Sequence, residues 1–155
     1  MTQDKIIQQE AGGKTIDIPR IEPLLLFENN CEAAIKVYQE AFNAELAVMM
    51  RYRDANTDNA EFVLKNESEK ELIYHAQLDF NGQRIILADN LFDKQPRGHT
   101  IYLGAFFKTE AAVRRAFEIL SDGATILSVP KSLDYTPCVA GLIDRFGIRW
   151  DLMVY

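Results

Sequence analysis

The side chains best suited to chemistry in this chain lie on a segment expected to be a strand. His75 alternates with Gln77 and Asp79 within 72–80, so the three side chains share one face of that strand. A neutral imidazole on such a face can bind a ligand or move a proton near neutral pH. Alternatively, His75 bonds a neighbouring side chain and only helps to fix the sheet. We take His75 and Gln77 as candidate ligand-binding residues.

Arg51, His99 and Asp151 are more isolated candidates. Arg51 lies on the less apolar face of a strand expected over 46–53, where its guanidinium could clamp an anionic group. A salt bridge or contact with solvent would also account for it. His99 stands in a polar linker, and Asp151 supplies a carboxylate on the last expected strand, 148–155.

Cys31 and Cys138 are the only two thiols of the chain. Neither has a neighbouring His or Lys that would lower its pKa, so nucleophilic cysteine catalysis is not expected. They lack a Cys-x-x-Cys spacing, and in a reducing cytosol two small buried or half-buried thiols are expected in place of a disulfide.

Composition restricts the class of protein. A chain of 155 residues, 48% hydrophobic and 26% charged, is expected to form a single globular domain with a sizeable core. The 17 basic and 23 acidic side chains give a net charge of −6 without a basic cluster, which argues against nucleic acid as a partner. No apolar run approaches the ~20 residues that cross a bilayer, and the N-terminus lacks the apolar core of a secretory signal. We therefore expect a cytoplasmic protein without a membrane partner.

The elements that must position these residues occur in two copies. The sequence Glu-Ala-Ala-Ile at 32–35 returns as Glu-Ala-Ala-Val at 110–113, an offset of 78 residues (110 minus 32). At the same offset, the apolar run 23–27 falls on 101–105. Two copies of this length predict paired modules within one body, because a solenoid requires more repeats.

Each copy is predicted to contain a strand, a helix and three further strands. The Asn81-Gly82 pair is typical of a tight hairpin turn. An exposed polar excursion is expected over 54–71, and a loop over 130–137. The predicted first copy comprises strand 21–27, a helix from Asn30 to near Asn43, and strands 46–53, 72–80 and 83–88; the second comprises strand 100–107, helix 109–121 and strands 125–129, 139–144 and 148–155.

This order predicts an α+β fold in which each helix covers one face of its sheet. Pairing two such sheets face to face would enclose a curled cleft. The modules are expected over 19–90 and 99–155, joined by a polar linker over 89–98. Residues 1–18 are expected to form a mobile N-terminal arm, with a possible edge strand at 15–18.

Three stretches resemble the PhnB-like branch of the vicinal oxygen chelate superfamily. They read FENNCEAA at 27–34, with Tyr38 and AFNA at 41–44 following; YHAQL at 74–78; and DRFGIRW at 144–150. The superfamily includes glyoxalase I, extradiol dioxygenases and bleomycin-binding resistance proteins. The resemblance covers about 21–155 and implies two βαβββ modules forming a cupped, mostly antiparallel sheet. It also implies a homodimer whose paired cups shelter a ligand.

Members of that superfamily with catalytic activity hold a divalent metal on side chains from four strands. The matching positions fall here on Pro23, on Ile101 and on Leu87 or Ala88, none of which has a side-chain donor. Only Asp151 keeps a carboxylate, whereas a Zn or Ni site needs at least three ligands. The resemblance therefore implies no tightly bound metal, and no other cofactor is expected.

The function expected is binding of a small organic molecule in the sheet cleft, with no reaction assigned. The candidate ligand-binding residues are His75, Gln77, Arg51, Asp151 and Tyr135; the last lies in a loop where relatives usually carry a Trp. One alternative is a metal-dependent lyase, isomerase or dioxygenase with relocated ligands His75, His99 and Asp151. Another is a structural or partner-binding domain. Methyl transfer, the activity named for some relatives, is poorly supported because the chain lacks a Gly-rich strand-to-helix turn.

Overall fold

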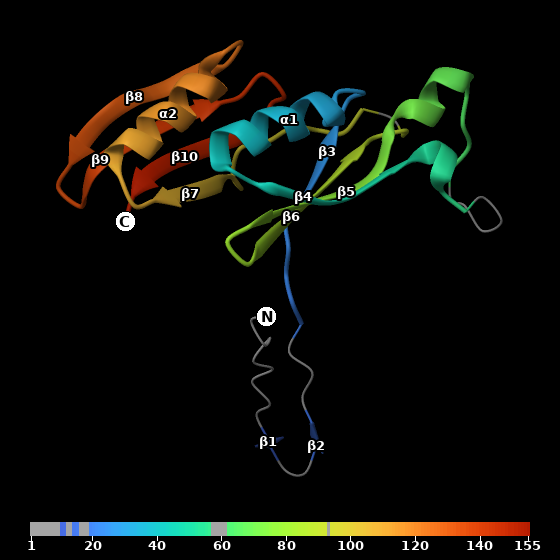
Figure 1. Cartoon of the computed structure of the whole chain (residues 1–155), viewed down its shortest axis with the longest axis horizontal. Helices are drawn as coiled ribbons and strands as arrows, with labels where there is room; N and C mark the ends of the chain where they lie inside the picture. The colour runs from blue at the N-terminus through green and yellow to red at the C-terminus, as the bar shows by residue number, and fades with distance from the viewer. Residues whose placement is uncertain (1–9, 12–13, 16–18, 57–61, 93) are drawn as a thin grey trace.

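A computed structural model describes residues 10–11, 14–15, 19–56, 62–92 and 94–155. Two modules follow one another, each in the order strand, helix, three strands, which confirms the predicted duplication (Figure 1). The first module comprises β3 Leu24–Phe27, α1 Cys31–Phe42, β4 Glu45–Arg51, β5 Ile73–Phe80 and β6 Gln83–Asp89, with 3₁₀ helices η1 Tyr52–Asp54 and η2 Glu67–Glu71 between β4 and β5. The second comprises β7 Leu103–Phe107, α2 Glu110–Ser121, β8 Thr125–Leu133, β9 Thr136–Ile143 and β10 Arg149–Val154.

The two sheets share one topology. Their strand orders are β3-β6-β5-β4 and β7-β10-β9-β8, so the first strand of each module always lies beside the last. That pair is parallel in both sheets, and the other neighbours are antiparallel. With one helix packed on each sheet, the predicted α+β class is confirmed.

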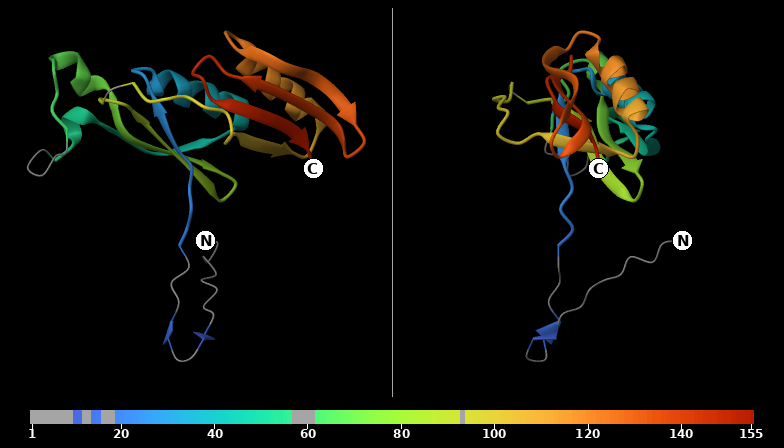
Figure 2. Two further views of the ribbon diagram at one scale, coloured as in Figure 1. Left: turned by 180° about the vertical axis from the view of Figure 1, so that it is seen from behind. Right: turned by 90° about the vertical axis from the view of Figure 1, so that its left-hand side faces the viewer.

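The modules lie side by side along the long axis of the molecule, with both helices on the same side (Figure 2). We call the sheet face opposite the helix the open face. Leu24, Leu26 and Phe106 on the open faces are exposed by 56%, 42% and 59%. The sheets of one chain therefore do not stack face to face, and any enclosed cleft between open faces requires a second chain.

An aromatic cluster joins the modules under the helices. Tyr38 of α1 is fully buried and meets Trp150 of β10 edge to face, with ring centroids 5.3 Å apart. Phe42, one helical turn further on, stacks on Phe107 of β7 at 6.3 Å. Such ring pairs add to the stabilisation that burial of their area provides. The first helix thus belongs to the core of both modules.

Asp144 lies at the centre of this junction. Its carboxylate accepts hydrogen bonds from Tyr38 Oη at 2.6 Å and from Trp150 Nε1 at 2.9 Å. The backbone N–H groups of Phe146 and Ile148 donate to the same carboxylate at 3.0 and 2.9 Å. One buried acidic side chain therefore connects α1 to the last hairpin of the chain.

Two local predictions are confirmed by backbone angles. Helix α1 ends before Asn43, whose φ of 52° is the left-handed conformation common after a helix C-terminus. Asn81 and Gly82 have φ values of 45° and 83°, as a two-residue hairpin turn between β5 and β6 requires.

The loop predicted over 130–137 is wrong. Strand β8 continues to Leu133, and β9 begins at Thr136 after a two-residue turn. Pro130 is tolerated inside β8 because this strand lies at the edge of its sheet and its pairing with β9 is irregular there.

The linker predicted over 89–98 begins too early. Asp89 is the last residue of β6 and is only 3% exposed. Its carboxylate accepts from the backbone N–H groups of Cys31 and Ile73 at 2.9 Å each, so it holds the start of α1 against β5.

Strand β4 does not alternate regularly between its two faces, as the strand expected over 46–53 would. A register shift separates Leu46, which pairs with Leu78, from Val48, which pairs with Gln77. Leu46 therefore packs toward the core while Val48 lies on the open face. A β-bulge of this kind cannot be recognised from hydrophobic periodicity.

The predicted mobile arm and its edge strand lie mostly outside the described residues. Within 1–18, only two short strands are described, β1 Glu10–Ala11 and β2 Lys14–Thr15, and they pair with each other. No helix in the described ranges is long and apolar enough to span a bilayer. Cys31 and Cys138 are free and buried, as predicted, and burial raises the pKa of both thiols.

Candidate functional site

His75 and Gln77 lie together on the open face of the first sheet. The residues that alternate with them, Ala76 and Leu78, are fully buried in the core. Gln77 Nε2 lies 2.8 Å from His75 Nε2, and an amide nitrogen can only donate. The amide and one ring nitrogen of the imidazole thus lie within hydrogen-bond distance of each other on the open face.

The neighbours of this pair on the open face are mostly apolar. Met50 of β4 lies opposite His75, and Val48 and Ile86 flank Gln77. One charged pair lies further along β5.

That charged pair consists of Asp79 and Arg84. Arg84 donates from two nitrogens to the Asp79 carboxylate, at 2.7 and 3.1 Å. This bidentate pairing lowers the pKa of Asp79. The Asp79 carboxylate is thus already bound, which leaves His75 and Gln77 as the available polar side chains that β5 places on the open face.

Asp151 lies on the open face of the second sheet, between two glycines. Its neighbours across the ladder are Gly104 on β7 and Gly141 on β9. A Cβ added at Gly141 would be 3.2 Å from Asp151 Oδ1, so the carboxylate lies directly beside that glycine. Within the described ranges, no hydrogen bond or ion pair engages this carboxylate.

Arg149 shares this open face, although it was not among the residues predicted to bind a ligand. Its guanidinium carbon lies 4.0 Å from the centroid of the Tyr102 ring, an arrangement that favours a cation. Its Nε is inaccessible to solvent and has no hydrogen-bond partner. Arg149 and Asp151 are alternate residues of β10, so their side chains point to the same face of the sheet. This spacing was the one sequence signal that could have placed Arg149 beside Asp151.

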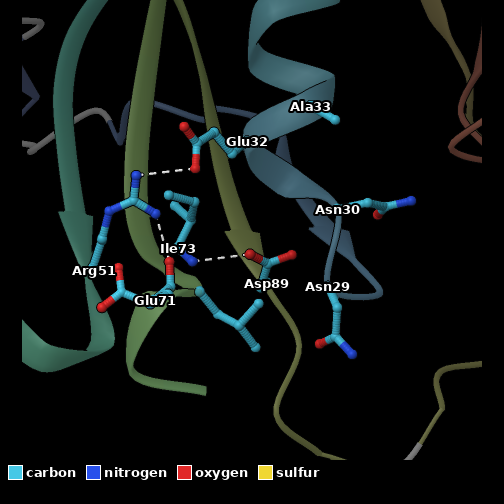
Figure 3. A pocket seen from close by; sticks show the side chains of 9 residues that line it. Asn29, Asn30, Glu32, Ala33, Arg51, Glu71, Ile73 and Asp89 are labelled. Atoms are coloured by element: carbon cyan, nitrogen blue, oxygen red, sulfur yellow. Dashed lines mark hydrogen bonds and ion pairs between the residues drawn. The ribbon is translucent and has the colours of Figure 1, made fainter. Parts of the chain in front are cut away.

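Arg51 lies on the other side of the molecule, in a pocket of about 440 Å³ beside the start of α1 (Figure 3). Its guanidinium donates to Glu32 Oε2 at 3.0 Å and to the Glu71 carbonyl at 2.5 Å. The contact with Arg51 lowers the pKa of Glu32. The structure therefore does not bring Arg51 together with His75, and its guanidinium already has acceptors from the protein.

Asp89 borders the same pocket and is shown bonded to Ile73 in Figure 3. Burial raises the pKa of its carboxyl group, against the opposing effect of the backbone hydrogen bonds that it accepts. The hydrogen bonds that its carboxylate accepts serve the fold, since they hold α1 and β5.

Tyr135 and His99 lie apart from the other candidates. Tyr135 is in the β8–β9 turn and is 72% exposed. His99 is exposed in the segment that joins the modules. Nowhere in the described ranges do three His, Cys, Asp or Glu side chains gather in a way that could hold a metal ion. The relocated set of His75, His99 and Asp151 is thus not assembled in this chain.

A groove of about 970 Å³ runs between the modules. The β5–β6 hairpin forms one wall and β7 the other, while Phe42 and Trp150 contribute aromatic surface. The groove extends to Gly104 and Phe106 on β7, beside the strand that carries Asp151. It offers a large, partly aromatic surface next to the second open face.

Residues 20–152 match the family model described as the Glyoxalase/Bleomycin resistance protein/Dioxygenase superfamily. The chain belongs to this superfamily. A comparison with curated proteins finds no match. The glyoxalase superfamily assignment therefore rests on the family model, and solved structures agree with it in fold.

Two solved structures illustrate this agreement. A putative 3-demethylubiquinone-9 3-methyltransferase, PhnB protein, from Bacillus cereus has a TM-score of 0.71 at 22% identity, covering 88% of this chain and 100% of that one. A protein from Pseudomonas aeruginosa has a TM-score of 0.73 at 21% identity, covering 88% and 98%.

A third solved structure is more distant. A glyoxalase/bleomycin resistance protein/dioxygenase family enzyme from Burkholderia phytofirmans has a TM-score of 0.56 at 15% identity, covering 84% of this chain and 94% of that one. At these identities the likeness shows the fold alone.

Proposed function

We propose that this glyoxalase-superfamily protein binds a small organic molecule against the open faces of its sheets, without a tightly bound metal. The observation that carries the proposal is the His75–Gln77 pair, set among apolar side chains on a face that no helix covers. A few polar groups within an apolar surface are the usual composition of a ligand site. Asp151 gives the second open face a carboxylate without a partner among the described residues.

We also propose that the protein acts as a homodimer. Both open faces expose large apolar side chains, among them Leu24, Leu26 and Phe106. A second copy would cover such surfaces and convert two open faces into an enclosed cleft. Sedimentation equilibrium tests this directly, because a monomer at micromolar concentration would contradict it.

We place the protein in the cytoplasm. Two free, buried thiols, Cys31 and Cys138, suit a reducing compartment. Localisation of a fluorescently tagged chain tests this.

The metal-free part of the proposal rests on side-chain chemistry. The positions where superfamily members would carry ligands hold Pro23, Ile101 and either Leu87 or Ala88, none of which has a side-chain donor. Metal analysis of tag-free protein should find no stoichiometric ion. Near-stoichiometric Zn, Ni, Mn or Fe would refute this part and favour a metal-dependent lyase, isomerase or dioxygenase.

A thermal-shift screen tests ligand binding itself. A ligand that binds only the native state at 100 times its Kd adds about 2.7 kcal/mol of stability, enough for a clear rise in Tm. Aromatic and aldehyde-derived compounds form the library. If none of them raises the Tm, the protein is better described as a structural or partner-binding domain.

The two histidines provide a matched pair of variants. His75→Ala should reduce the ligand-induced shift, because it removes the imidazole that lies beside Gln77 on the open face. His99→Ala should leave it unchanged, since His99 is exposed in the connecting segment. Equal losses in both variants would contradict the site and favour the relocated metal centre.

A further inference from the structure

We infer that the open face of the second sheet receives an acidic group of the ligand: Arg149, stacked on Tyr102, binds a carboxylate or phosphate, and Asp151 accepts a hydrogen bond from an amine or hydroxyl of the same molecule. This inference rests on the proposed function and narrows its ligand to molecules that carry both groups.

The position of Arg149 follows from the ladder. Arg149 lies opposite Ile143 on β9, and its neighbour Trp150 is 3% exposed on the helix side. The guanidinium therefore extends over the open face, where the Tyr102 ring supports it at 4.0 Å. Stacking holds the plane of the guanidinium, and only its two Nη groups are accessible to a ligand, because Nε is inaccessible to solvent. That planar fork matches the oxygens of a carboxylate or phosphate.

Arg149 differs from every other arginine in the described ranges. Five of them donate to or pair with carboxylates inside the protein: Arg51, Arg53, Arg84, Arg114 and Arg145. Arg20 pairs with Glu22, and Arg97 and Arg115 donate to backbone carbonyls. Arg149 alone in this part of the chain has no acceptor, although its Nε is withdrawn from solvent. A ligand anion would therefore be held by the two Nη groups, which are not buried, and not by Nε.

Asp151 is flanked by a glycine on each neighbouring strand. The glycines on both sides, Gly104 and Gly141, place no side chain beside the carboxylate. The Phe106 ring leans over Gly104, within 3.1 Å of where a Cβ would lie, and forms an aromatic wall. Arg149 and Asp151 do not form an ion pair with each other, so both charges remain available.

The spacing of the two residues sets the size of the ligand. Alternate residues of a strand are separated by about 6.6 Å along its axis. Arg149 and Asp151 are such a pair on β10. The fitting molecule therefore carries its acidic group and its donor several bonds apart, on a body that can pack against Phe106.

Calorimetric titration with four probes tests this. 4-(Aminomethyl)benzoate carries both groups, benzoate and benzylamine carry one each, and inorganic phosphate tests the anion without an apolar body. Wild-type protein should bind 4-(aminomethyl)benzoate most tightly. Arg149→Gln should weaken binding of every anionic probe by about 10-fold or more, the usual effect of losing a charge-assisted contact. Asp151→Asn should bind 4-(aminomethyl)benzoate no more tightly than benzoate, and its affinity for benzoate should equal that of the wild type.

Two surface variants serve as controls. Arg114→Gln and Asp122→Asn change the same residue types on exposed positions at α2 and should bind all probes as wild type does. Thermal unfolding of each variant shows whether it is folded. A further variant, Tyr102→Leu, removes the ring on which the guanidinium stacks and keeps Arg149 itself. We expect it to lose anion binding in part.

Three results would overturn the inference. These are unchanged anion binding by folded Arg149→Gln, equal binding of benzylamine and 4-(aminomethyl)benzoate by wild type, and no binding of any probe by wild type. Failure of the proposed function would look different, because neutral library members would then also fail to raise the Tm. Neutral ligands that depend on His75, with Arg149 unimportant, would reject this inference and leave the proposed function standing.

Discussion

Replacing Asp144 by Ala should weaken the link between the two modules more than any conservative change in the aromatic cluster. The carboxylate is 4% exposed and accepts four hydrogen bonds. Two of the donors, Tyr38 Oη and Trp150 Nε1, are buried side-chain groups that would be left without a partner. An unsatisfied buried donor costs about 1–3 kcal/mol.

The two donors together cost about 2–6 kcal/mol in Asp144→Ala, a large part of the ~5–15 kcal/mol that stabilises a typical domain. Tyr38→Phe removes one donor and leaves the other three in place, so it should cost about 1–2 kcal/mol. Asp122→Ala is the control, because its side chain is 82% exposed, and it should change stability by less than about 0.5 kcal/mol.

Urea unfolding followed by Trp150 fluorescence is the assay. Trp150 is the only tryptophan and contacts both Asp144 and Tyr38, so its emission reports on the junction itself. Far-UV circular dichroism of the same samples shows whether the modules still unfold together. A loss below about 1 kcal/mol in Asp144→Ala, or an equal loss in Tyr38→Phe, would refute the role assigned to this carboxylate.

Three further predictions concern other parts of the chain. Gly147→Ala should destabilise the protein by at least about 1–2 kcal/mol in urea unfolding, because its φ of 87° is unfavourable for a residue with a Cβ. Arg51 lowers the pKa of Glu32, so their contact stabilises the fold above the unfolded-state pKa of Glu32 and is lost as the pH falls through the lowered value. NMR titration of Arg51→Met should show the pKa of Glu32 rising toward its usual value; an unchanged pKa would contradict this. Cys31 and Cys138 should react with a thiol reagent at pH 8 only after unfolding, because burial raises both pKa values; rapid labelling of native protein would contradict this.

The modular fold could be predicted because its signals are local or repeated. The Glu-Ala-Ala motif marks the start of both helices, and Asn81-Gly82 marks the hairpin by its positive φ values. The strict alternation around His75 correctly placed Gln77 on the same face. These features depend on neighbours a few residues apart, which hydrophobic periodicity and turn chemistry describe well.

The remaining features depend on contacts between distant residues. Asp144 and Tyr38 are 106 positions apart, and no sequence pattern near either residue predicts the hydrogen bond between them. The sequence around Arg149 does not show whether its guanidinium has an acceptor. That depends on residues of other strands, which only the folded structure brings near it. The β-bulge in β4 likewise follows from pairing with β5, because a strand shifts its register to match its partner.

The side-by-side arrangement of the sheets has a consequence for the site. His75 and Asp151 lie on different sheets of one chain, and both open faces remain exposed. A homodimer could pair the first module of one copy with the second module of the other. The open face that carries His75 would then lie against the partner's open face that carries Arg149 and Asp151. The ligand would then contact both copies, so that dissociation of the dimer and loss of binding should occur over the same protein concentrations.

An NMR titration of chelator-treated, isotope-labelled protein with 4-(aminomethyl)benzoate shows whether a ligand binds the open faces without metal. We expect amide shift changes along β5 and β10, and the same changes after zinc is added. Shift changes that appear only with zinc, or that cluster around Arg51 beside the start of α1, would contradict this expectation.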